Sequence, residues 1–565
     1  MKLPLPDRLM LVLALIASSA AIAAEPAPAS PFTTAGLPPT VAAAAAGIDG
    51  ERIRSHVRFL SSDLLEGRGT GSRGGDIAAD YLATQFALAG LKPAGDDGTF
   101  LQKVRFAGSQ TLDSTTLSFV PNEGEALPLK LFDDYVLSNH TLTDSVKVDA
   151  PLVFVGYGIE APEYQWDDYK GVDVRGKVAL IIVNEPPSTD PKFFKGEALT
   201  YYGRWTYKYE QAARKGAVGA VIIHRDDLAS YPWSVVKSSW SNEAVALADD
   251  ANPRLQAAAW VQLEVARLLL SLSGKDLDAA IKLAGTREFK AFELPVRLNA
   301  AIDSRVRRFE SSNVVAMLPA TDKASAKQAV LYSAHYDHLG IVPDMPGDNI
   351  FNGAIDNATG CAVVLELARA YASMKDRSPH PVIFAAVTAE EKGLLGSKYL
   401  GEHPPIPASQ IGLNLNFDSF APIGVPESVK MLGSERLSFF PTVEKTAKAF
   451  KLAIEADSRP LAGSYYRSDH FSMARVGVPA FSVSLGDKFV GQTREWAQEK
   501  SREYTAKNYH QPSDEYRADM DFASSVEIAR FGFALGWQAL SAKAPIAWLP
   551  GDEFEATRLK SERNP

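Results

Sequence analysis

The chain has 565 residues, of which 46% are hydrophobic and 22% are charged, a composition typical of a globular protein with more than one domain. Its net charge of -9 and isoelectric point near 5.6 argue against a nucleic-acid partner, because nucleic acids are bound by basic surfaces. Cys361 is the single cysteine, which excludes an internal disulfide framework.

The first 24 residues are typical of a secretory signal peptide. Lys2 and Arg8 precede an apolar run over 9–16, and the small residues at 21–24 suit signal peptidase. The alternative, a membrane anchor, is disfavoured because the apolar run is too short to span a bilayer comfortably. We therefore expect an exported protein, periplasmic or secreted, with no stable membrane insertion after signal cleavage.

Residues 25–47 are rich in alanine and proline and are interpreted as a poorly ordered lead-in. Residues 48–149 are expected to form the N-terminal part of a larger domain, with helical patterns near 48–64 and 76–91. Between these helices, the glycines of "EGRGTGSRGG" suggest a phosphate-binding loop. No strand precedes them and no Gly-Lys-Ser/Thr follows, so we expect a structural loop instead.

Residues 150–294 differ in sequence pattern from the rest of the chain. Short strand-like runs such as "PLVFVGYGI", "GKVALIIVN" and "AVGAVIIH" are separated by turn residues, and "YEQAARKGA" reads as a helix. This pattern predicts a small, β-rich module that is inserted into a larger domain.

Residues 295–565 are expected to form the main part of that larger domain. Strand-like runs such as "QAVLYSAHYD", "PVIFAAVTAEE" and "IGLNLNFD" alternate with helical segments such as "ATGCAVVLELARAYASM". The alternation favours an α/β fold, with a mainly parallel mixed sheet sandwiched by helices. In such folds the chemistry gathers at the carboxyl ends of the strands.

Acids and histidines recur at those strand ends and in the loops beside them. Each one alone is a weak signal, since a helix cap or a structural ion pair explains it equally well. Together they indicate a metal site, because buried acids are costly and few Lys or Arg residues lie near them in the sequence. The candidates are His335, Asp337, Asp356, Glu390, Glu391, Asp418, His510 and Asp514.

The number of carboxylates favours two divalent ions. Three carboxylates and one shared hydroxide balance the charge of two such ions, and each ion would then have one imidazole and carboxylate oxygens. This donor set suits zinc, with Co²⁺ or Mn²⁺ as possible substitutes. Of the neighbours Glu390 and Glu391, one would bind metal and the other would act as the general base, and spacing alone does not say which.

Six motifs in this order resemble the di-zinc (co-catalytic) aminopeptidases, the family of secreted bacterial leucyl aminopeptidases and aminopeptidase Y. They are "SAHYDHLG", "NGAIDNATG", "TAEEKGLLGS", "NFDS", "SDHFSM" and "YHQPSD". The resemblance covers about 300–540 and the N-terminal "LEGRGTGSRGGDIAADYLATQF". The module at 150–294 is similar to the protease-associated domain found in many members.

The resemblance implies a role for each matching residue. The implied metal ligands are His335 and Asp418 for one zinc, Glu391 and His510 for the other, and Asp356 as the bridge. Glu390 would be the general acid/base, with Asp337 orienting His335 and Asp514 orienting His510. In the stretch "GSYYRSDHFSM", Asp469 would be a supporting residue, and Tyr465 or Tyr466 would donate to the substrate oxyanion.

The family implies a zinc-dependent exopeptidase that removes N-terminal residues from peptides with a free N-terminus, using a metal-bridging hydroxide. Two other enzyme activities stay open. A carboxypeptidase needs a cation for the substrate's carboxylate, for which Arg467 is the candidate, and a glutaminyl cyclase-like acyltransferase would keep one zinc. A non-catalytic binding protein with a structural metal site is the alternative of another class, which an unliganded Glu390 disfavours.

Overall fold

The computed structural model describes residues 37–563, except 230, 322–327, 344 and 459. The predicted signal peptide and most of the predicted lead-in lie outside the described residues. The end of the lead-in forms α1 (Pro39–Ala46), which packs against α9 (Thr359–Ser373) and α14 (Ala523–Leu540). Its five consecutive alanines favour a helix. Because this helix packs on the rest of the molecule, the end of the segment is ordered, which differs from the prediction of a poorly ordered lead-in.

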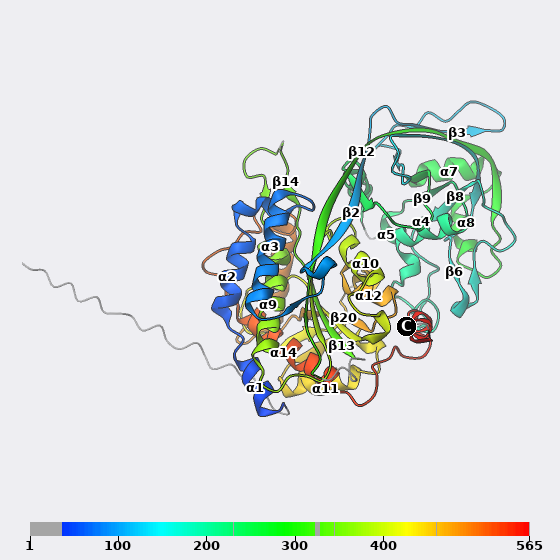
Figure 1. Cartoon of the computed structure of the whole chain (residues 1–565). Helices are drawn as coiled ribbons and strands as arrows, with labels where there is room; N and C mark the ends of the chain where they lie inside the picture. Colours follow the sequence, from blue (N-terminus) through cyan, green and yellow to red (C-terminus); the bar gives the residue numbers. More distant parts are fainter. Residues whose placement is uncertain (1–36, 230, 322–327, 344, 459, 564–565) are drawn as a thin grey trace, which may run out of the picture.

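Two parts of the molecule are joined by a pair of long strands, β2 (Leu101–Thr111) and β12 (Phe292–Leu318) (Figure 1). The two strands pair antiparallel, and β12 continues from the sheet of one part into the sheet of the other. The sequence indicated only the C-terminal portion of β12 as a strand. Its middle alternates buried and exposed side chains, as expected for a strand that crosses between two cores.

The larger part has a central sheet with the strand order β19-β18-β20-β17-β13-β16-β12. The four inner strands β20, β17, β13 and β16 run parallel, and β12 is antiparallel to β16. This arrangement confirms the predicted α/β class with a mainly parallel mixed sheet. The strands are β13 (Ala329–His335), β16 (Val382–Val387), β17 (Ile411–Phe417), β18 (Ser428–Lys430), β19 (Ala453–Glu455) and β20 (Ala480–Leu485).

Helices cover both faces of this sheet, and β13, β16 and β17 are therefore buried along their whole length. One layer contains α1, α9, α14, α2 (Gly50–Leu60) and α3 (Arg73–Leu88). The opposite face carries α10 (Leu395–Glu402) and α12 (His470–Arg475), which contact each other. Within the described residues, no helix combines the length and the apolar character that crossing a membrane requires. The other helices of this part are α11 (Phe440–Ala449), α13 (Arg494–Lys507) and α15 (Glu555–Arg563).

The smaller part has its own sheet and its own hydrophobic core. Strands β5, β8, β9 and β11 run parallel, with β12 and β4 antiparallel at the two ends. The core includes residues on both sides of the predicted range 150–294, such as Phe119, Tyr135 and Ile302, because β3 and β4 join this sheet. The elements are β3 (Thr116–Pro121), β4 (Tyr135–Ser138), β5 (Ser145–Phe154), β8 (Val178–Ile182), β9 (Gly219–Ile223), β11 (Ala257–Val261), α4 (Trp205–Arg214), α5 (Asp226–Ala229), α6 (Trp233–Trp240), α7 (Leu263–Ser271) and α8 (Leu277–Ala284).

The two parts also touch near the tyrosine segment at 464–467. Arg475 of α12 forms an ion pair with Glu210 of α4 at 3.2 Å, and the Tyr201 ring lies 4.9 Å from that of Phe471. Leu199 donates its backbone N–H to Pro460 at 3.1 Å. The smaller part is therefore held against the loop that leads into α12.

The glycine-rich segment at 66–75 is the structural loop that the sequence predicted. It forms the end of η1 (Asp63–Arg68) and the start of α3, which lie against each other. A Cβ atom on Gly74 would lie 1.7 Å from the carbonyl oxygen of Leu65. Glycine is needed here because the two backbones approach too closely for any side chain.

Candidate metal centre

The carboxyl ends of three adjacent parallel strands supply most of the predicted site. His335 is the last residue of β13, Glu390 and Glu391 follow β16, and Asp418 follows β17. Because β16, β13 and β17 are neighbours in the sheet, their ends meet at one edge. Asp356 comes from η6 (Ala354–Ala358), the short π-helical turn before α9, and His510 follows α13.

Asp356 lies between the two histidines. His335 Nε2 is 3.3 Å from Asp356 Oδ1, and His510 Nε2 is 3.3 Å from Asp356 Oδ2. His335 Nε2 is also 3.3 Å from Asp418 Oδ1, and His510 Nε2 is 3.2 Å from Glu391 Oε2. Each imidazole thus faces one oxygen of the shared Asp356 and one oxygen of a second carboxylate.

The two neighbouring glutamates reach different sides of this cluster. Donor atoms of Glu391, Asp356 and His335 lie within 4.8 Å of one another, and a second such group contains Glu390, Asp418 and His335. The two acids lie in the turn that follows β16, in which the backbone oxygen of Glu390 accepts from the N–H groups of Gly393 and Leu394. The geometry brings both acids to the site, and the division into ligand and general base stays a prediction.

The carboxylates dominate the electrostatics of the cluster. Burial opposes a charged ring, but Glu390 and Asp418 raise the pKa of His335 well above its usual value. In the same way, hydrogen bonds with Asp356 and Glu391 outweigh burial and raise the pKa of His510 to about 10. Burial raises the pKa of Glu390 well above its usual range, and the neighbouring Glu391 adds to this effect. The site therefore favours bound positive charge.

The residues present fit divalent zinc. Two imidazoles and three carboxylates converge, and the side chains of His335, Asp356 and Glu391 are at most 5% exposed. Across the described part of the chain, neither Lys nor Arg forms an ion pair with Asp356, Glu391 or Asp418. Buried acids of this kind need compensating charge, and nitrogen and oxygen donors of this type are those that zinc takes in proteins.

Asp337 supports the site differently from the sequence prediction. His335 Nδ1 lies 3.2 Å from the backbone oxygen of Asp337 and 4.0 Å from its carboxylate. The carboxylate instead accepts from the backbone N–H of Glu390 at 3.0 Å and from the Thr70 hydroxyl at 2.9 Å. The main-chain oxygen orients the ring, and the side chain positions Glu390.

Asp514 supports Asp356, whereas the sequence suggested that it would orient His510. Its carboxylate accepts from the backbone N–H groups of Ile355 and Asp356, both at 3.0 Å. His510 is held by the Tyr509 ring, which stacks on it with centroids 3.9 Å apart. Asp514 therefore fixes the backbone at Asp356, and the adjacent tyrosine ring supports His510.

The tyrosine segment lies beside the cluster, but its hydroxyl groups are engaged elsewhere. Tyr465 donates to the backbone oxygen of Ala480 at 3.1 Å, and Tyr466 donates to Glu553 at 2.7 Å. Donation to a substrate would require one of these bonds to break, and this role stays a prediction. Burial raises the pKa of the nearby Asp469 carboxyl to about 7, and its place as a supporting residue also stays a prediction.

Several residues of the site were missed in the sequence. His338 is fully buried, and its Nδ1 lies 2.7 Å from Glu391 Oε1. Ser468 donates its hydroxyl to Asp418 Oδ2 at 2.8 Å. Arg68 is fully buried and donates to the backbone oxygens of Tyr336, Asn352 and Gly353. The one available signal was position, since both His338 and Arg68 lie within the motifs "SAHYDHLG" and "LEGRGTGSRGG".

Comparisons with known proteins give one family match and similar curated proteins. Residues 313–531 match peptidase family M28. Leupeptin-inactivating enzyme 1 of Streptomyces exfoliatus is 28% identical over 272 residues, which cover 46% of this chain and 56% of that protein. Aminopeptidase YwaD of Bacillus subtilis is 28% identical over 188 residues, 33% of this chain and 35% of that one. The chain thus spans about half or less of these two relatives.

Among solved structures, the aminopeptidase from Aneurinibacillus sp. strain AM-1 aligns over 88% of this chain and 95% of its own. The identity is 19% and the TM-score is 0.49.

Proposed function

Because this chain carries a peptidase family M28 domain at residues 313–531, we propose that it is a zinc-dependent aminopeptidase acting on peptides with a free N-terminus. The observation that carries the proposal is the position of Asp356, whose two carboxylate oxygens each lie 3.3 Å from a different histidine. A carboxylate shared in this way suits two adjacent ions. We therefore propose two zinc ions per chain, with cobalt or manganese as substitutes.

In this proposal the ligands of the two ions lie on opposite sides of Asp356. His335 and Asp418 would hold one zinc, and His510 and Glu391 would hold the other. When bound, the pair of ions would polarise the scissile carbonyl and favour deprotonation of the attacking water. Asp356 lies between the two halves of the site. The carboxylate of Asp514 fixes it by accepting from the backbone N–H of Asp356.

Glu390 is the proposed general base. Its backbone N–H is held by Asp337 at 3.0 Å, and its carboxylate lies in the group with His335 and Asp418. The carboxylate would accept a proton from the attacking water and then donate it to the leaving amine, as general acid–base catalysis requires. The surrounding acids would also attract the positively charged α-amino group of the substrate.

Blocking the substrate's amino group tests the proposal. Purified protein should hydrolyse aminoacyl 4-nitroanilides, and N-acetylation of the same substrates should abolish turnover. Elemental analysis should find about two zinc ions per active chain, with activity lost to a chelator and restored by Zn²⁺ or Co²⁺. Efficient cleavage of the acetylated substrate would contradict aminopeptidase action, and full activity with one ion would contradict the two-zinc site.

We also propose that the chain is exported. The basic, apolar and small-residue pattern of residues 1–24 supports this. The N-terminus of the protein recovered from cells should begin near residue 25, outside the cytoplasmic fraction. A cytoplasmic protein that retains residues 1–24 would contradict export.

A further inference from the structure

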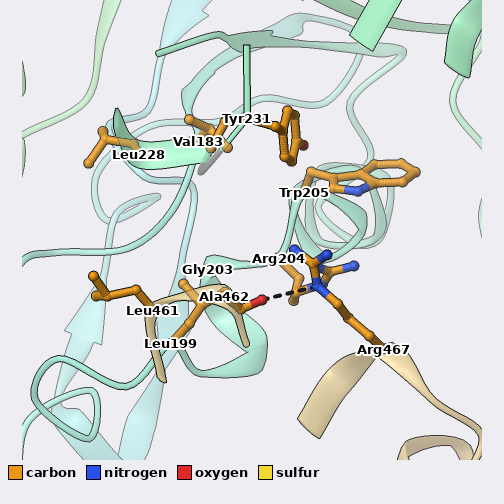
Figure 2. Close-up of a pocket in the computed structure, with 11 residues that line it drawn as sticks. Val183, Leu199, Gly203, Arg204, Trp205, Leu228, Tyr231, Leu461, Ala462 and Arg467 are labelled. Carbon is orange, nitrogen blue, oxygen red and sulfur yellow. Dashed lines mark hydrogen bonds between the residues drawn. The ribbon is translucent and has the colours of Figure 1, made fainter. Parts of the chain in front are cut away.

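A pocket lies where the smaller part meets the tyrosine segment. Its space is about 310 Å³, including the portion open to solvent. Two arginines line it, Arg204 from the smaller part and Arg467 from the tyrosine segment, and Figure 2 shows their guanidinium groups side by side. The remaining wall includes Trp205, Tyr231 and Leu461.

The two guanidinium groups lack a carboxylate partner. Arg467 donates its Nε–H to the backbone oxygen of Ala462 at 3.0 Å, and among the described residues Arg204 forms no ion pair. Burial and the nearby Arg467 lower the pKa of Arg204 to about 10. Arg204 is partly buried and Arg467 is exposed, and an anion placed between two neighbouring cations favours the charged form of both.

Three other described cations near this junction have carboxylate partners. Arg475 pairs with Glu210 at 3.2 Å, and Lys195 lies 3.5 Å from Asp552. Arg436 is bound to Asp552 at 2.7 Å. Among the described residues, Arg204 and Arg467 differ from these three because neither forms an ion pair, which leaves both guanidinium groups open to an anion from outside the protein.

The start of α4 adds to the positive potential. The helix begins at Trp205 in the pocket wall, and its first turn contains no acidic residue. The free backbone N–H groups of a helix N-terminus carry partial positive charge and usually attract an acid. At this end of α4 the arginine pair adds to the positive potential, and the described first turn contains no acid that would offset it.

We propose that Arg204 and Arg467 bind a carboxylate of the peptide substrate, beyond the bond that is cleaved. This inference rests on the proposed aminopeptidase function. Arg467 directly precedes Ser468, whose hydroxyl contacts Asp418 at 2.8 Å. The backbone of Arg467 is therefore one residue from a group that contacts the metal centre, and a peptide lying along this segment would meet the pocket.

A carboxylate matches the chemistry of this pocket. Guanidinium groups bind carboxylates through paired, charge-assisted hydrogen bonds. The acidic cluster would hold the amino end of a short peptide, so the opposite end presents either its terminal carboxylate or an Asp or Glu side chain. Both sources share the same chemistry, and substrates can separate them.

The test compares three tripeptides: one with a free C-terminus, its C-terminal amide, and an amide that carries Glu at the third position. The variants are Arg204→Gln and Arg467→Gln. The matched control is Arg225→Gln, which removes an arginine whose Nε–H already donates to Asp227 at 2.9 Å. Melting curves check that each variant is folded.

For the wild-type chain, we expect kcat/KM for the free acid to exceed that for the neutral amide by about tenfold, mainly through KM. A tenfold ratio corresponds to about 1.4 kcal/mol, which is the scale of one charge-assisted hydrogen bond. Each pocket variant should reduce the ratio to near one and leave the neutral amide unchanged, whereas Arg225→Gln should keep the ratio. If kcat/KM is instead highest for the Glu-bearing amide, the carboxylate that the pocket binds is that of an acidic side chain.

Equal rates for acid and amide in the wild-type chain, or a ratio that both pocket variants retain, would overturn the inference. A measurement of peptide binding tests the inference without requiring turnover. Calorimetry with the full chain carrying Glu390→Gln should show tighter binding of the free acid than of the amide, and Arg467→Gln should remove the difference. If no tripeptide is cleaved but this difference appears, the proposed function fails and the carboxylate site stands.

Discussion

Glu390 and Glu391 are adjacent in sequence but meet different partners. Glu391 lies 2.7 Å from His338 and 3.2 Å from His510, so its carboxylate is fixed from two sides. Glu390 has its backbone held by Asp337, and its carboxyl is kept in a buried, acidic setting that raises its pKa. A fixed carboxylate suits a metal ligand, and a carboxyl that readily binds a proton suits a general base.

Replacing each glutamate should therefore produce a different failure. Glu390→Gln keeps size and polarity but cannot accept a proton, so kcat should fall by about 10²–10⁴-fold while both zinc ions stay bound. Glu391→Gln replaces a charged ligand with a weak neutral one, so zinc content should fall, and added zinc should restore some activity. Zinc stoichiometry measured beside kcat separates the two cases. Loss of metal in Glu390→Gln with full metal in Glu391→Gln would reverse the assignment.

The sequence indicated the acids and histidines of the site because each follows a strand or precedes a helix. Buried strands read clearly as apolar runs, and neighbouring parallel strands end at one edge. It could not indicate which support reaches which ligand. Asp514 contacts the backbone of Asp356, and Thr70 contacts Asp337, through folding that joins residues far apart in the chain. Such contacts depend on loop geometry that no local pattern encodes.

At the scale of elements, the contact between η1 and α3 joins the N-terminal segment to the site. η1 ends at Arg68, which donates to the backbone of Tyr336, next to His335. α3 can lie close to η1 only because Gly74 has no side chain. The glycines that suggested a phosphate loop thus serve the packing of two backbones.

Gly74→Ala should destabilise the protein strongly. Its Cβ would lie 1.7 Å from the Leu65 oxygen and 2.4 Å from the Leu65 carbon, so one backbone has to move. Overpacking of this kind costs about 1–3 kcal/mol or more. The shift would reach Arg68, so activity should fall as well as the midpoint of urea unfolding. The matched control is Gly50→Ala in α2, where the nearest atom is 3.4 Å away. Equal stability of the two variants would contradict the packing argument.

Element prediction succeeded where periodicity was strong and failed where pairing is long-range. The buried strands β13, β16 and β17 were each indicated by an apolar run. The smaller part was wider than predicted because β3 and β4 pair with strands far along the chain. Whether this part is a protease-associated domain stays a prediction.

At the scale of the whole molecule, the fold gathers uncompensated negative charge at one sheet edge. Asp356 and Glu391 are almost fully buried, and within the described residues their ion pairs are with histidines. The sequence showed that these acids would converge, but the charge balance depends on the full set of neighbours. Without cations, the repulsion between buried carboxylates opposes folding.

Removal of metal should therefore destabilise the whole larger part of the molecule. A ligand that binds only the folded state stabilises it by about 2.7 kcal/mol when its free concentration is 100 times the Kd. Chelator-treated protein should melt several degrees below the zinc-loaded protein, and the melting temperature should rise with zinc concentration. Mg²⁺ is the matched control, because it prefers oxygen ligands and should not reproduce the shift. Glu391→Gln should show a smaller zinc-induced shift than the wild-type chain, since one site has lost a charged ligand. Scanning calorimetry measures each of these samples, and identical melting temperatures with and without zinc would show that the acids are balanced by some other means.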